Sequence, residues 1–137
     1  MSFPLGFSAT FTCDNEMEIF ADGQSLGKDK NWKKPTTYLV PANTRVLSVA
    51  GKDRGGGFGI IGSTSHGLVT DETWKCSSDL QSEWNSPDFD DQDWPLAKVV
   101  GINGGSPRGK IHGIAEMAKW IWADNNKDVV YCRLKLK

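Results

Sequence analysis

Hydrophobic and polar residues alternate in short runs along most of the chain, a pattern typical of half-buried β-strands rather than of helices. The clearest run lies at 130–137, where apolar side chains alternate with more polar ones. Its apolar face comprises Val130, Cys132, Leu134 and Leu136, and the face expected to meet solvent comprises Tyr131, Arg133, Lys135 and Lys137. A sheet with one buried and one solvated face produces this alternation, so the pattern favours an antiparallel β-sandwich.

Further runs of the same kind, each bounded by turn residues, predict strands at 7–12, 16–21, 24–27, 38–40, 45–50, 97–102 and 119–123. Asp22-Gly23 is the strongest hairpin signal in the chain, because both residues tolerate the backbone of a tight turn. One short helical turn is expected at 114–119. We find no internal repeat or interdomain linker, so residues 1–137 are expected to form a single all-β domain.

Tryptophans recur at positions 74, 84 and 94, a fixed interval of ten. This spacing suits short strands joined by turns, which recur about every 8–12 residues in all-β domains. Each indole can bury about 200 Å² of surface, so the three can anchor a core. The acidic run at 88–93 is expected to form a turn that delivers Phe89 and Trp94 into that core.

Composition excludes several classes of function. The 137 residues carry a formal charge of −1, which offers no basic field for nucleic acid. No run approaches 18 apolar residues, so we expect no membrane insertion. No signal peptide is visible, which leaves an intracellular protein or a mature segment with a new Met1. The chain has three cysteines. In a secreted protein an odd number leaves one free thiol or one intermolecular disulfide, and the alternative is that all three are reduced.

Four segments carry a resemblance to a known family: DNEMEIFADGQSLG at 14–27, TDETWKCS at 70–77, SPDFDDQDWPLA at 86–97, and AKWIWA followed by VVYCRLKL. Together they resemble the galactose-binding-domain-like jelly roll, which occurs in sugar-binding and accessory domains of glycoside hydrolases and in lectin-like proteins. The resemblance implies a jelly-roll β-sandwich of two antiparallel sheets and a carbohydrate-binding, lectin-like domain. It also implies an extracellular or secreted location.

The predicted order of strands suggests where a sugar would bind. If the strands run alternately up and down, the loops at 13–16, 28–35, 51–58 and 77–90 gather at the end opposite Asp22-Gly23. Aromatic rings stack on the C–H patches of sugars, and Asp, Asn and Arg bond their hydroxyls. The ligand-binding residues predicted at that end are therefore Asn15, Trp32, Asp53, Arg54 and Trp84. Arg108 and His112, in loop 103–113 with Asn103, form a second candidate site at the other end. For Trp32 and Trp84 the alternative is that each ring simply covers the end of the sandwich.

No catalytic or cofactor motif accompanies these residues. His66 and His112 lie outside HExxH, no GxSxG is present, and the glycines at 55–59 lack the context of a phosphate-binding loop. We therefore expect no enzymatic activity and no cofactor, with a structural calcium at the acidic run kept as an alternative. The expected partners are glycans or glycoproteins, with homo-oligomers as a route to multivalency. The competing hypotheses are a structural or protein-interaction module on the same fold and, third, a small glycoside-acting hydrolase.

Overall fold

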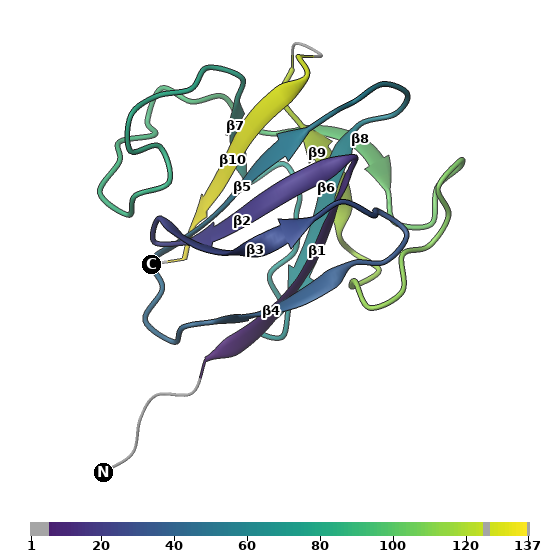
Figure 1. Cartoon of the computed structure of the whole chain (residues 1–137), viewed down its shortest axis with the longest axis horizontal. Coiled ribbons are helices and arrows are strands. Elements are labelled where there is room, and N and C mark those ends of the chain that lie inside the picture. Colours follow the sequence, from purple (N-terminus) through teal and green to yellow (C-terminus); the bar gives the residue numbers. More distant parts are fainter. Residues whose placement is uncertain (1–5, 125–126, 137) are drawn as a thin grey trace.

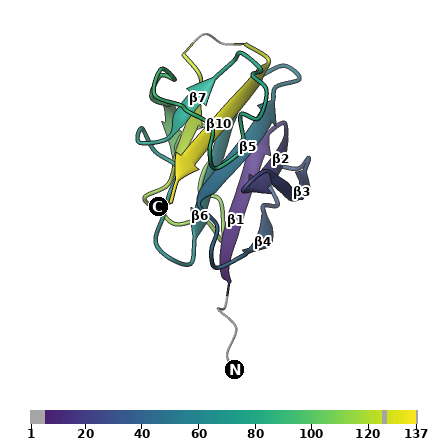
Figure 2. The same cartoon turned by 90° about the vertical axis from the view of Figure 1, so that its left-hand side faces the viewer.

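Two five-stranded antiparallel sheets pack face to face in a computed structural model that describes residues 6–124 and 127–136 (Figure 1). The ten strands are β1 (Phe7–Asp14), β2 (Glu16–Ala21), β3 (Gln24–Asp29), β4 (Thr36–Val40), β5 (Val46–Lys52), β6 (Gly59–Thr64), β7 (Lys75–Ser77), β8 (Lys98–Ile102), β9 (Lys119–Trp122) and β10 (Val129–Lys135). The first sheet has the order β4-β1-β6-β9-β8 and the second the order β3-β2-β5-β10-β7. Figure 2 shows the strands of the second sheet side by side in this order. The predicted all-β sandwich is confirmed.

The alternation seen in the sequence fills the space between the sheets. On β2, Met17, Ile19 and Ala21 are buried while the intervening residues are half-buried. Val49 of β5 and Cys132 of β10 join the same buried cluster. Trp74 packs there too, its ring centroid 5.9 Å from that of Phe11. These apolar side chains face inward from both sheets and form the main core.

Loops cover part of the outer face of each sheet. Over the first sheet, Ile111 and Ile114 pack with Ile61 and Trp120. Over the second, Trp84 packs against Phe20, Tyr131 and Trp94, with ring centroids 5.0–6.5 Å apart. Trp84 and Trp94 are therefore buried, but outside the main core between the sheets, so the prediction that the acidic run delivers Trp94 into that core is wrong.

The prediction that the polar face of the last strand meets solvent is wrong for Arg133. Its side chain is fully buried beneath the segment 86–91. Its guanidinium donates to the carbonyl oxygens of Ser86 and Phe89 and to Asp91 Oδ2, at 2.6–3.1 Å. A buried arginine needs such partners, and here they come from a loop that crosses the sheet. Lys137, predicted on the same face, lies outside the described residues.

Two other expectations are settled by the fold. The helical turn predicted at 114–119 is wrong, because this segment forms non-helical turns that lead into β9. A disulfide joins Cys76 of β7 to Cys132 of β10, and Cys13 is a buried free thiol. Burial raises the pKa of the Cys13 thiol far above its ordinary value.

Within the described residues, no helix is long and apolar enough to cross a bilayer.

Candidate functional site

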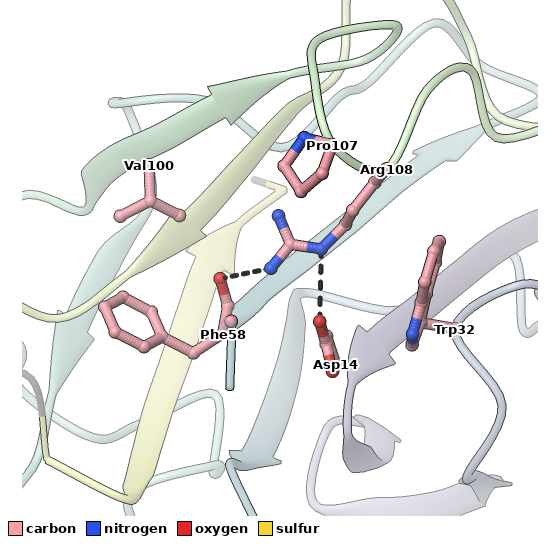
Figure 3. Close-up of a pocket in the computed structure, with 7 residues that line it drawn as sticks. Asp14, Trp32, Phe58, Val100, Pro107 and Arg108 are labelled. Atoms are coloured by element: carbon pink, nitrogen blue, oxygen red, sulfur yellow. Dashed lines mark hydrogen bonds and ion pairs between the residues drawn. The ribbon is translucent and has the colours of Figure 1, made fainter. Parts of the chain in front are cut away.

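A cavity of about 360 Å³ opens where β1 ends. It is lined by Asp14, Trp32, Gly57, Phe58, Val100, Pro107 and Arg108 (Figure 3). These residues come from β1, from β8, and from the loops at 30–35, 53–58 and 103–113. Its volume lies at the small end of the range for small-molecule sites, about 300–1,000 Å³. Segments far apart in the chain therefore build one concave site.

Arg108 lies at the centre of this cavity. Its Nε donates to Asp14 Oδ2 at 3.1 Å, and its Nη2 donates to the carbonyl oxygen of Phe58 at 3.0 Å. Asp14 is itself buried, with 8% of its surface exposed. A carboxylate removed from water in this way needs a charged partner, and Arg108 supplies it. The ion pair fixes the tip of loop 103–113 against the end of β1.

Aromatic rings support Arg108 from beneath and beside the cavity: Trp32 lines it, and Trp120 is buried behind the guanidinium. The Arg108 guanidinium carbon lies 4.2 Å from the centroid of the Trp120 ring, within the range of a cation–π contact. Trp32 meets Trp120 edge to face, with 6.5 Å between ring centroids. The guanidinium is thus held on three sides. Its third nitrogen, Nη1, donates to no group among the described residues.

Gly57 leaves room for the guanidinium. A Cβ atom at this position would lie only 2.7 Å from Arg108 Nη2 and 3.5 Å from Asp14 Oδ2. A contact under 3 Å would require the arginine to move. Glycine is needed here for this close approach rather than for an unusual backbone angle.

Loop 103–113 is shaped by a buried asparagine. The Asn103 side chain donates to the carbonyl oxygens of Ile114 and Ala115 and accepts a hydrogen bond from the Ile111 N–H, at 2.8–3.2 Å. The loop also contains a cis Ser106–Pro107 peptide bond. Asn103, expected as part of a second binding site, is therefore committed to holding the loop.

The prediction that loop 103–113 lies at the opposite end from Trp32 is wrong. The loop folds back over the outer face of the first sheet, because Ile111 and Ile114 pack there with Trp120. This packing carries Arg108 to Asp14 and Trp32. Two of the predicted ligand-binding residues, Trp32 and Arg108, therefore line one cavity. His112 is exposed and does not line it.

The prediction that Trp84 joins this end is also wrong. The segment after β7 turns back along the outer face of the second sheet, where Trp84 packs against Tyr131 at a tilted angle. Asn85 reaches the Asp22-Gly23 hairpin, since a Cβ on Gly23 would lie 3.5 Å from Asn85 Oδ1. In Figure 1 this segment and loop 103–113 lie on opposite sides of the molecule.

Three other predicted residues form a turn beside the cavity without lining it. Asn15 Oδ1 accepts the Arg54 N–H at 2.7 Å, and Asp53 Oδ1 accepts the Gly55 N–H at 2.9 Å. The Arg54 side chain pairs with Glu16, and this hydrogen bond lowers the pKa of that carboxyl. Asn15, Asp53 and Arg54 thus border the site, and their contact with a ligand stays a prediction.

Several lining residues were not identified from the sequence. Asp14 fell within the predicted loop 13–16, although its position at the end of a buried strand could have marked it. Phe58, Val100 and Pro107 carry no signal of their own. Each becomes part of the site through the three-dimensional path of the loops.

The acidic run at 88–93 has partners within the protein. Asp91 pairs with Lys75, Arg133 and Lys135, and Asp90 accepts the Gln92 N–H. Among residues 6–124 and 127–136, no group of three or more His, Cys, Asp or Glu side chains is placed to hold a metal ion.

Comparison with known proteins places this fold beside two carbohydrate-active proteins. No family model matches the chain. An α-L-rhamnosidase from Streptomyces avermitilis is 24% identical over 135 residues, which covers 85% of this chain. The chain spans only 13% of that enzyme.

Solved structures show the same relation. A lectin from Pleurotus ostreatus, in complex with GalNAc, matches with a TM-score of 0.71 and 21% identity over 82% of this chain and 36% of the lectin chain. The S. avermitilis α-L-rhamnosidase, complexed with L-rhamnose, matches with a TM-score of 0.56 and 19% identity over 84% of this chain. Both similarities concern the fold, and they agree with the jelly-roll β-sandwich of two antiparallel sheets that the resemblance in the sequence implied.

Proposed function

We propose that this chain is a non-catalytic carbohydrate-binding domain, and that its sugar site is the cavity around Arg108 and Trp32. One observation carries the proposal. Arg108 is held by Asp14, by the Phe58 carbonyl and by the Trp120 ring, yet its Nη1 has no hydrogen-bond partner within residues 6–124 and 127–136. A donor fixed in advance loses little conformational freedom when a ligand arrives.

The chemistry of the cavity fits a sugar. Arg108 Nη1 can donate a hydrogen bond to one sugar hydroxyl. Asp14 Oδ1 can accept a hydrogen bond from the adjacent hydroxyl on the sugar ring. Trp32 and Phe58 offer apolar faces beside these groups, as Figure 3 shows. Polar groups that fix orientation within a mostly apolar lining are typical of small-molecule sites.

A purely structural role for Arg108 is the main alternative. The pair with Asp14 would then only fasten loop 103–113, and the chain would be a protein-interaction module. An apolar patch in place of a polar cavity would favour that alternative. The buried ion pair inside a concave site favours ligand binding instead.

The lining gives little support to a hydrolase. Glycosidases use two carboxyl groups about 5–10 Å apart. Asp14 is the one carboxylate among the residues that line this cavity, and it is already paired with Arg108.

The proposed partners are glycans or glycoproteins outside the cell. A disulfide between Cys76 and Cys132 agrees with an oxidising compartment. Single sugar sites bind weakly because water competes for every hydroxyl, so several copies of the domain would act together.

The test is calorimetric titration with a panel of monosaccharides that starts with GalNAc and L-rhamnose and includes galactose and glucose. Arg108→Lys keeps a charge for Asp14 but removes the planar donors. Losing a hydrogen bond from a charged group costs about 1.5–3 kcal/mol, so we expect roughly 10- to 100-fold weaker binding. Trp32→Ala should also weaken binding and should leave the melting temperature unchanged.

Arg45→Ala is the matched control, because Arg45 pairs with Asp88 on the surface, away from the cavity. Its affinity should equal that of the unmodified chain. Arg54→Ala asks whether the site extends to the neighbouring turn. Absence of binding across a broad glycan array, or unchanged affinity in both cavity variants, would overturn the proposal.

A further inference from the structure

A second cavity, of about 260 Å³, lies on the other sheet. It is lined by Thr73, Lys75, Asp91, Arg133, Leu134 and Lys135. Lys75 of β7 lies directly opposite Arg133 of β10, and Lys135 follows two residues later on the same strand. The pairing of the two strands therefore brings three cationic side chains to one place.

These three cations surround a single carboxylate. Arg133 Nη1 lies 2.6 Å from Asp91 Oδ2, while the Nζ atoms of Lys75 and Lys135 lie 3.5 and 3.6 Å from Asp91 Oδ1. No other acidic residue lines the cavity. The lining therefore carries two positive charges more than Asp91 neutralises. An unbalanced cluster of this kind attracts anions.

The members of the cluster differ in how firmly they are held. Arg133 is fully buried and bonded to the segment 86–91, and its Nε has no hydrogen-bond partner among the described residues. Arg133 alone suffices to neutralise Asp91. Lys135 is half exposed, with 50% of its side chain accessible, and Lys75 has 29% accessible. Lys75 Nζ also donates to the backbone carbonyl oxygen of Asp91 at 3.0 Å, so Lys75 and Arg133 both keep the segment 86–91 in place, while the more exposed Lys135 can turn toward a ligand.

We propose that this cavity binds a tetrahedral oxyanion, a sulfate or phosphate group. Both lysine ammonium groups lie beside the same carboxylate oxygen, so an oxyanion next to Asp91 can accept from the two together. Hydrogen bonds between charged groups are stronger than neutral ones, which favours an anion over a neutral hydroxyl here. The group could be free in solution or an ester carried by a glycan, and the chemistry of recognition is the same.

A purely structural role, in which the cluster only holds the segment 86–91 against the sheet, would explain the pair formed by Arg133 and Asp91. Lys75 also fits that role, because its Nζ donates to the Asp91 carbonyl oxygen, but Lys135 does not: a third cation in one cavity is repelled by the other two. The proposal concerns a site formed by different strands from the cavity at Arg108. It therefore stands or falls independently of sugar binding there.

The test is calorimetric titration of the whole chain with inorganic sulfate and inorganic phosphate at constant ionic strength, which chloride maintains. The key variant is Lys135→Met. Its matched control is Lys98→Met, because Lys98 is as exposed as Lys135, at 49% against 50%, and lies 3.5 Å from another carboxylate, the exposed Asp124, away from the cavity. We expect Lys135→Met to bind the oxyanion at least about fivefold more weakly, and Lys98→Met to bind it unchanged.

A second arm separates the two sources of the group. A sulfated disaccharide is compared with its desulfated form and with sulfate alone. Tighter binding of the sulfated sugar identifies a glycan ester, whereas equal binding of sulfate alone identifies a free anion. Arg108→Lys should change neither result. The proposal is overturned if neither anion binds at millimolar concentration, or if Lys135→Met and Lys98→Met behave alike.

Discussion

Arg108 and Gly57 illustrate how the candidate sugar site depends on single residues. The guanidinium occupies space that exists only because position 57 lacks a side chain. Its hydrogen bonds to Asp14 and Phe58 then fix the direction in which the unused nitrogen points. Affinity for a sugar should therefore be sensitive to a single methyl group added at position 57.

Gly57→Ala tests this dependence. The new Cβ would lie 2.7 Å from Arg108 Nη2, the far end of a flexible side chain, so the arginine should shift while the fold survives. We expect at least about fivefold weaker sugar binding, equivalent to about 1 kcal/mol, measured by calorimetry. Gly101→Ala is the control, because its Cβ would make only an ordinary contact at 3.5 Å. Equal affinities in the two variants would show that the position of Arg108 does not matter for binding.

The three-residue strand β7 is the element most dependent on a covalent bond. Cys76 pairs directly with Cys132 of β10, and the disulfide closes a separation of 56 residues. Disulfides typically stabilise a fold by about 2–4 kcal/mol. We expect Cys76→Ala/Cys132→Ala to lower the free energy of unfolding in urea by about that amount. Sugar affinity should persist, because the Arg108 cavity is built from other strands.

Thiol titration is the internal check on this prediction. Cys13 is buried and its pKa is raised, so the thiol stays protonated and shielded at neutral pH. No thiol should react in the native chain, one should react after unfolding without reductant, and three after reduction. A native chain with two or more reactive thiols would contradict the disulfide. Reductant should then destabilise the unmodified chain but not the double variant.

How far the sequence predicts this fold depends on the element. Eight of the ten described strands were predictable, because a residue such as Ile19 or Val49 shows its buried face through the period of two, whereas β6 and β7 were not among the predicted runs. The covering segments were not. Periodicity identifies which residues share a face of a strand, but it does not say which loop covers that face. Arg133 was therefore assigned to solvent and Trp84 to the wrong end, and the meeting of Arg108 with Trp32 was missed.

At the scale of the whole molecule, the tryptophans form two groups, those buried in the fold and the one that lines the proposed sugar site. Five indoles are at least 93% buried, and they lie at Trp74, Trp84, Trp94, Trp120 and Trp122. Trp32 is half-buried and lines the cavity. The emission of the folded chain therefore combines five shielded indoles with one that a ligand can cover. This contrast allows a whole-molecule measurement to report on one site.

Acrylamide quenching of the intrinsic fluorescence should expose that difference. A bound sugar that stacks on Trp32 would exclude the neutral quencher from this ring, while the other five indoles are already shielded. We expect quenching to fall saturably as sugar is added, with the same dissociation constant as calorimetry gives. In Trp32→Phe the aromatic wall remains but the fluorophore is gone, so sugar should no longer alter quenching. If sugar protected Trp32→Phe as strongly as the unmodified chain, the ligand would be binding near another tryptophan and the cavity at Arg108 would be the wrong site.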